Sequence, residues 1–269
     1  MTCRRDPGPP RRRLPGEGSF PEQLASLGLP WLSENLQDFV ARATKERLTP
    51  LQLVEELVRM EAVHHAGRSL ESRLARAQLG RFKPMADFDW DWPKSIDRPL
   101  VESLFDMTFM RDARNVVLVG TQGLGKTMIA KNLAMAAVQK GYSALYAPAS
   151  KVIADIGGQD GAWMRERCFR RYCRPALLII DEIGYLAYDN AAADILFQLV
   201  NRRYETKPVV LTTNLVFRDW SAIFPNAASA SALVDRLTHH SNVVVIKGES
   251  YRKHEAKLDR KGAKDEQDE

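Results

Sequence analysis

The glycine-rich segment at residues 120–127 constrains the fold of this chain more than any other feature. It reads GTQGLGKT, follows an apolar, β-branched run at 115–119 and precedes a helical pattern at 128–139. Between a strand and a helix, the spacing G-x-x-x-x-G-K-[ST] suits phosphate, because glycines let backbone N–H groups point inward and the helix start adds partial positive charge. The predicted phosphate-binding residues are Gly120, Thr121, Gln122, Gly123, Leu124, Gly125, Lys126, Thr127 and Met128.

Two side chains of this segment are candidates for direct contact with a nucleoside triphosphate. We expect the Lys126 ammonium group to reach the β- and γ-phosphates and the Thr127 hydroxyl to ligate Mg²⁺. A chance glycine-rich turn is the alternative, and the strand before it and the helix after it argue against that interpretation. ATP and Mg²⁺ are therefore the predicted cofactors.

A second signal is a pair of adjacent carboxylates, Asp181 and Glu182, directly after the apolar run 177–180. Parallel α/β sheets bind ligands at their carboxyl edge, where this pair would lie. Asp181 fits the acid that holds Mg²⁺ through water, and Glu182 fits the base that polarises an attacking water. A solvated loop would also accommodate two acids, but a Glu directly after the Asp favours hydrolysis over phosphoryl transfer to a small acceptor.

Short β-branched runs alternate with helical stretches from residue 115 onward, which predicts a buried parallel sheet with helices on both faces. Asn214 follows the fourth run, where its side chain could hydrogen-bond the attacking water or the γ-phosphate. In the additional-strand class of phosphate-loop ATPases this polar strand lies between the other two, which gives the sheet order 5-1-4-3-2. The five runs are residues 116–119, 143–146, 177–180, 209–212 and 243–246.

Composition and periodicity divide the chain into four parts. The first residues are rich in Arg, Pro and Gly without hydrophobic period, which is typical of disorder. Helical spacing then begins, as at Leu32, Leu36 and Phe39. The predicted parts are a disordered basic tail (1–20), a helical module with its linker (21–92), an α/β domain that contains the phosphate loop (93–257) and a frayed charged tail (258–269).

The composition also excludes several classes of protein. With 45% hydrophobic residues, 16 Gly and 14 Pro, the chain is neither collagen-like nor disordered throughout. Its longest apolar candidate, 116–138, is interrupted by polar side chains, so we expect no membrane helix. Three cysteines are too few for a disulfide scaffold, and the start has no apolar signal segment. These features predict a cytoplasmic protein.

A basic cluster makes DNA a candidate partner. The formal net charge is +5, which permits a polyanionic partner without requiring one. Phosphate backbones attract arginine groups of this kind, whereas a solvated helix face is the alternative. In the sequence only Glu166 opposes the cluster. The candidates are Lys151, Arg165, Arg167, Arg170, Arg171 and Arg174, with a second basic stretch at Arg68, Arg73, Arg76, Arg81 and Lys83.

Four segments carry a family resemblance. GTQGLGKT, LLIIDEIGYL, VVLTTNLVFRDW and LVDRLTHHSNVVVIKGESYR resemble the IstB-like ATPases, helper proteins of insertion-sequence transposition that are themselves similar to DnaC helicase loaders. The resemblance covers residues 21–254, and the last segment is far more specific than the phosphate loop. It implies an AAA+ ATPase core with a reduced lid, preceded by a helical module that binds a partner.

The same resemblance implies roles for two arginines and a set of partners. Arg236 corresponds to the arginine finger that reaches the γ-phosphate of a neighbouring subunit, and Arg252 to the sensor arginine that contacts nucleotide in its own chain. A guanidinium suits both roles because it stays charged and presents a fork of donors. The implied partners are duplex DNA without sequence preference, a transposase and further copies of the chain. A DnaC-like helicase loader and a small-molecule kinase are the alternatives.

Overall fold

The computed structural model describes residues 18–185, 187–224 and 227–251, and the chain folds as two compact units, one up to Glu71 and one from Ser72 onward. The predicted C-terminal tail, most of the N-terminal tail and the sensor candidate Arg252 lie outside the described residues. In the described part of the chain, no helix combines the length and the apolar character needed to span a membrane.

The first unit is all helical, as predicted. Proline occupies the first position of its second and third helices, where the missing N–H costs nothing. Leu24, Leu32 and Phe39 form its buried core, with Leu53 and Leu57 packed against it. The helices are α1 (Phe20–Ser26), α2 (Pro30–Lys45) and the larger part of α3 (Pro50–Ala77).

A buried carboxylate fixes the start of α2. Glu61 of α3 is only 5% exposed, and its Oε1 accepts the backbone N–H of Leu32 at 2.7 Å. The first N–H groups of a helix lack partners inside the helix, and a carboxylate there also interacts favourably with the helix dipole. Helix α3 therefore caps α2 from a distant point in the sequence.

We expect Glu61→Ala to lower the free energy of unfolding of the first unit by about 1–3 kcal/mol, because a buried N–H loses its acceptor. Glu61→Gln keeps an acceptor oxygen and serves as the matched control. Hydrogen exchange at the Leu32 amide in the full chain measures the effect, and unchanged protection in Glu61→Ala would contradict it.

The second unit is built on a five-stranded parallel sheet with the order β2-β3-β4-β1-β5, which confirms the predicted order 5-1-4-3-2. The central strands are buried on both faces, which is why their sequences are continuous apolar runs. The strands are β1 (Asn115–Gly120), β2 (Ala144–Pro148), β3 (Leu177–Ile183), β4 (Val209–Thr213) and β5 (Ser241–Ile246).

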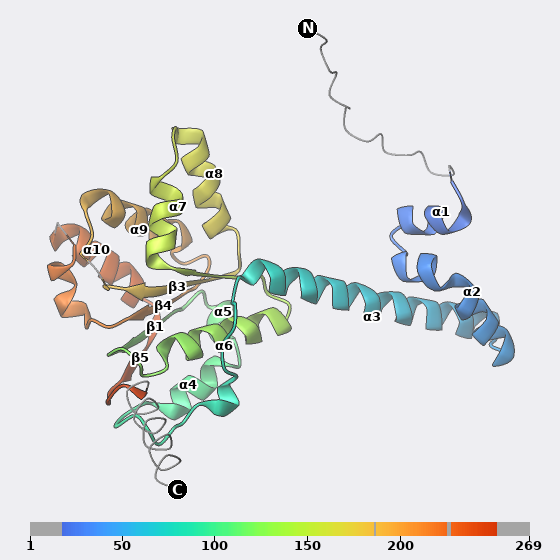
Figure 1. The fold of residues 1–269 in the computed structure, drawn as a ribbon, viewed down its shortest axis with the longest axis horizontal. Coiled ribbons are helices and arrows are strands. Elements are labelled where there is room, and N and C mark those ends of the chain that lie inside the picture. The colour runs from blue at the N-terminus through green and yellow to red at the C-terminus, as the bar shows by residue number, and fades with distance from the viewer. Residues whose placement is uncertain (1–17, 186, 225–226, 252–269) are drawn as a thin grey trace, which may run out of the picture. The chain divides into compact units, whose positions relative to one another are not determined.

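Helices cover both faces of this sheet (Figure 1). On one face lie α4 (Arg98–Leu104), α5 (Thr108–Arg111) and α6 (Lys126–Gln139). On the other lie α7 (Ala149–Gly157), α8 (Ala162–Cys173), α9 (Asn190–Arg203) and α10 (Ala227–Thr238), which close the main hydrophobic core. Short 3-10 helices η1 (Met85–Asp87) and η2 (Phe217–Ala222) complete the described elements. This layering leaves the carboxyl edge of the strands open for a site.

Candidate functional site

The predicted phosphate loop joins β1 to α6 at the carboxyl edge of the sheet. Gly123 and Gly125 have φ angles of 80° and 82°, a left-handed conformation that favours glycine. A side chain at Gly125 would also place its Cβ 2.5 Å from Cε2 of Phe88, and one at Gly120 would lie 2.5 Å from the carbonyl oxygen of Ile246. Conformation and close packing therefore both require glycine in this loop.

Lys126, the first residue of α6, folds back over the loop. Its Nζ donates hydrogen bonds to the carbonyl oxygens of Gly120 at 2.6 Å and Thr121 at 2.7 Å. The same side chain lines the adjoining cavity. A cationic group at a glycine loop that leads into a helix N-terminus is suited to bind an anion at this point.

A buried carboxylate connects the acidic strand to the start of α6. Asp181, at the carboxyl end of β3, is 2% exposed. Its Oδ1 accepts hydrogen bonds from the hydroxyls of Thr127 at 3.2 Å and Thr212 at 2.5 Å, and its Oδ2 accepts one from Tyr146 at 2.6 Å. The loop and the carboxylate, 54 residues apart in sequence, thus form one site.

The oxygen atoms of Thr127 and Asp181 fit a hard divalent cation, which prefers such ligands. Asp181 is buried beside the Thr127 hydroxyl, so two oxygen atoms that could ligate the same cation lie next to each other. Burial and the hydrogen bond to Asp181 raise the pKa of Tyr146 well above its usual range, so this hydroxyl stays protonated and donates.

Glu182 follows Asp181 in a left-handed conformation with φ 63°. Its backbone N–H donates to Oγ1 of Thr212 at 2.9 Å, and its side chain is exposed toward the cavity. Asn214, just beyond β4, lines the same cavity. Thr212 therefore holds both members of the acidic pair, while the left-handed turn separates their side chains, one buried and one exposed.

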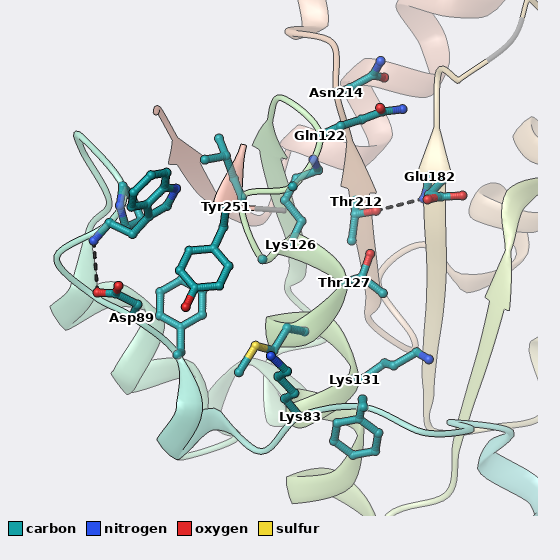
Figure 2. Close-up of a pocket in the computed structure, with 18 of the residues that line it drawn as sticks. Lys83, Asp89, Gln122, Lys126, Thr127, Lys131, Glu182, Thr212, Asn214 and Tyr251 are labelled. Carbon is teal, nitrogen blue, oxygen red and sulfur yellow. Dashed lines mark hydrogen bonds between the residues drawn. The ribbon is translucent and has the colours of Figure 1, made fainter. Parts of the chain in front are cut away.

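The cavity has a volume of about 670 Å³, within the range of small-molecule sites. Figure 2 shows Lys126 between Tyr251 on one side and Thr127, Thr212 and Glu182 on the other. Aromatic rings of Phe88, Trp92, Tyr185 and Tyr251 line part of its wall. A cavity with a cationic, glycine-lined end and an aromatic wall suits a nucleotide, which has a phosphate end and a flat base.

Sequence reasoning missed several of these residues. Tyr146 lies in the middle of β2, and the predicted order, with β2 beside β3, was a signal that could have found it. Lys131 lies over the Tyr146 ring, with its Nζ 4.6 Å from the ring centre. Trp92 and Tyr251 meet edge to face at 5.5 Å, although 159 positions separate them in the sequence and no local pattern indicates their contact.

Arg236 does not line the cavity of its own chain. It lies on α10, where its Nε donates to Oδ1 of Asn201 at 2.8 Å and its guanidinium carbon lies 4.9 Å from the Phe197 ring centre. These contacts occupy Nε and one face of the guanidinium group. A role in the nucleotide site of the same subunit is therefore not supported by its position.

The basic candidates on α7 and α8 lie apart from the cavity lining. Their ion pairs reveal a second opposing acid that the sequence interpretation overlooked, because Asp155 contacts both Lys151 at 3.4 Å and Arg171 at 3.3 Å. Arg170 pairs with Glu166 at 3.4 Å. Arg165 and Arg167 are exposed and make no ion pair with any described residue.

The fold and this site define a class, the P-loop AAA+ fold. A solved structure of DnaI, 16% identical, shares the fold with a TM-score of 0.53 over 63% of this chain and 93% of that one. A family model described as IstB-like ATP binding protein matches residues 22–259. The chain belongs to this IstB-like family, which confirms the resemblance seen in the sequence.

Two relatives illustrate the family. The ATP-binding protein of insertion sequence IS21 from Pseudomonas aeruginosa is 35% identical over 229 residues, which cover 85% of this chain and 86% of the relative. The corresponding protein of IS5376 from Geobacillus stearothermophilus is 32% identical over 245 residues, 91% of this chain and 98% of the relative. The similarity therefore extends across the first and the second unit alike.

We expect Tyr146→Phe to raise the Mg²⁺ concentration needed for nucleotide binding by about 10-fold, because partners that orient a metal-binding carboxylate contribute on this scale. Thermal unfolding with a non-hydrolysable ATP analogue, titrated with MgCl2, measures the shift. Tyr142→Phe, in the turn before β2, is the matched control. An equal Mg²⁺ midpoint in Tyr146→Phe and the wild type would refute the positioning role.

Proposed function

We propose that the chain is an ATP-dependent DNA-binding helper of a transposase, which assembles with ATP on target DNA and hydrolyses ATP to ADP and phosphate. The observation that carries the proposal is the hydrogen bond between Thr127 and Asp181, which unites the glycine loop and the acidic strand in one site. Proteins of this kind use hydrolysis as a switch between conformations, so turnover need not be fast.

Nucleotide binding rests on the loop and the aromatic wall. Backbone N–H groups of the glycine loop and the Lys126 ammonium group bind the phosphates, and Thr127 and Asp181 hold Mg²⁺. When bound, Mg²⁺ neutralises charge on the phosphate oxygens. The aromatic side chains of Phe88, Trp92 and Tyr251 face the base. We also propose, from the family resemblance, that Arg252 is the sensor arginine that contacts the nucleotide in its own chain.

Hydrolysis rests on Glu182 and Asn214. Glu182 polarises the attacking water as a general base, and Asn214 orients that water or the γ-phosphate. Two features support these roles: both side chains line the cavity, and the carboxylate of Glu182 is exposed while that of Asp181 is buried. The two acids thus have separate environments, which suits separate roles in metal binding and proton transfer.

Oligomerisation rests on Arg236. Its Nε donates to Asn201 and its guanidinium group lies near the rings of Phe197 and Tyr204, while its two terminal nitrogens make no hydrogen bond with a described residue. A guanidinium presented in this way can form two parallel hydrogen bonds with phosphate oxygens. Since Arg236 does not line its own cavity, we propose that it acts in the site of a neighbouring subunit.

DNA binding rests on α7 and α8. We propose that Lys151, Arg165, Arg167, Arg170 and Arg171 contact the phosphates of duplex DNA without sequence preference. The exposure of these side chains supports the proposal, although Asp155 and Glu166 reduce the effective charge of three of them.

The transposase partnership is supported by the relatives' association with insertion sequences. A cytoplasmic location follows from a function on chromosomal DNA.

We expect Glu182→Gln to bind ATP with unchanged affinity, to lose at least about 100-fold in hydrolysis rate because the general base is gone, and to remain longer on DNA. Release of free phosphate with and without duplex DNA is the measurement. Lys126→Ala, which removes the charge facing the phosphates, is the comparison that loses nucleotide binding itself. Wild-type turnover in Glu182→Gln, or a phosphorylated acceptor in place of free phosphate, would overturn the proposal.

The trans role of Arg236 predicts complementation between two inactive variants. Arg236→Ala binds ATP but lacks the finger, and Lys126→Ala lacks nucleotide binding but still supplies Arg236. Mixed assemblies contain interfaces with both residues intact, so the mixture should regain phosphate release that neither variant shows alone. Arg218→Ala, at an exposed arginine of η2, is the control. Normal hydrolysis by Arg236→Ala alone would exclude the role.

A further inference from the structure

A large aromatic side chain is exposed to solvent at the start of α8. Trp163 is 69% exposed, whereas the other four tryptophans of the chain are buried or half-buried. The next residue, Met164, is 42% exposed. Burial of these two side chains against a partner would be favourable, so the pair is a candidate contact surface.

The local backbone presents this pair at a tip. The turn between α7 and α8 contains Gly161, whose φ of 95° favours glycine, and α8 begins at the next residue. Figure 1 shows the turn at the end of the α7–α8 pair that lies away from the strands. The guanidinium carbon of Arg167 lies 5.7 Å from the Trp163 ring centre, so one face of the indole packs against a cation.

The arginines along α8 and directly after it indicate the chemistry of the partner. Arg165 and Arg167 are exposed on the same helix, and Arg174 follows its end; none of the three forms an ion pair with a described residue. An apolar protein surface would not match three unpaired cations. A partner that offers both flat rings and a row of anionic groups does match them, and nucleic acid has that composition.

We propose that Trp163 stacks on a nucleobase of the bound DNA, with Met164 inserted beside it and the neighbouring arginines on the flanking phosphates. This inference rests on the DNA binding of the proposed function and adds its mode. Apolar side chains inserted at a base step partly unstack it, and base stacking on an aromatic ring tolerates any sequence. The α8 tip therefore adds an uncharged contribution to an otherwise electrostatic contact, and it favours DNA positions where a base is easily exposed.

The first test compares affinities of the full chain, with a non-hydrolysable ATP analogue, for a fluorescein-labelled duplex at several salt concentrations. Trp163→Ala should weaken binding by about 10-fold and leave the slope of log affinity against log salt unchanged, because no charge is lost. Trp163→Phe keeps a ring and should recover most of the affinity. The double variant Arg165→Ala/Arg174→Ala should instead reduce the slope by about one for each lost phosphate contact.

The second test reads the stacking directly. Addition of DNA should quench tryptophan emission in the wild type and in Trp31→Phe, a control in the helical module, but not in Trp163→Phe. A duplex with one mismatched pair should bind the wild type more tightly than a matched duplex, because a mismatched base costs less to unstack. Trp163→Ala should bind both duplexes equally.

The outcomes of these tests distinguish failure of the stacking inference from failure of the proposed DNA binding. If the double arginine variant lowers the salt slope while Trp163→Ala binds and discriminates as the wild type does, DNA binding stands and the stacking inference is overturned. If Trp163→Ala changes self-association in sedimentation and leaves DNA affinity unchanged, the surface contacts protein and the inference is overturned too. If the wild type binds no duplex at low salt, the proposed function itself fails.

Discussion

The site depends on one buried carboxylate. Asp181 is almost fully removed from water, and an ion in that position requires partners that satisfy its oxygens. Hydroxyls from α6, β4 and β2 supply them, through Thr127, Thr212 and Tyr146. Because these donors come from separate elements, the carboxylate fixes the glycine loop, the acidic strand and the strand between them in one register. The geometry of the cavity follows from that network.

Most of the second unit could be predicted because its signals are local. A strand of β-branched residues, a glycine turn and a helix follow one another in sequence, and the alternation of runs and helices predicted a parallel sheet. The strand order was predicted from the class of phosphate-loop ATPases and not from local spacing. What escaped prediction depends on long-range contact. The Tyr146 hydroxyl donates to Asp181 on the neighbouring strand. Trp92 contacts Tyr251, although most of the sequence of the second unit lies between them. No spacing in the sequence encodes either pair.

In the helical module, the sequence predicted the helices but not which of their side chains are buried. Its apolar spacing predicted helices, and helices are present, but periodicity did not show which face is buried. Leu57 packs on the module's core, whereas Leu51, Val54 and Val58 of the same helix are exposed. Burial is decided by where the neighbouring helices lie, and a buried carboxylate such as Glu61 has no apolar signature at all.

The glycine loop is also held by contacts from two segments of the second unit that lie far apart in the sequence. The Tyr251 N–H donates to the Gly123 carbonyl at 2.9 Å, and the Trp92 indole donates to the Glu249 carbonyl at 2.8 Å. Trp92 and Tyr251 also meet edge to face, so the indole lies two contacts away from the glycine loop. We therefore expect the emission of Trp92 to change when phosphate occupies this site, which would make it a reporter that needs no added label.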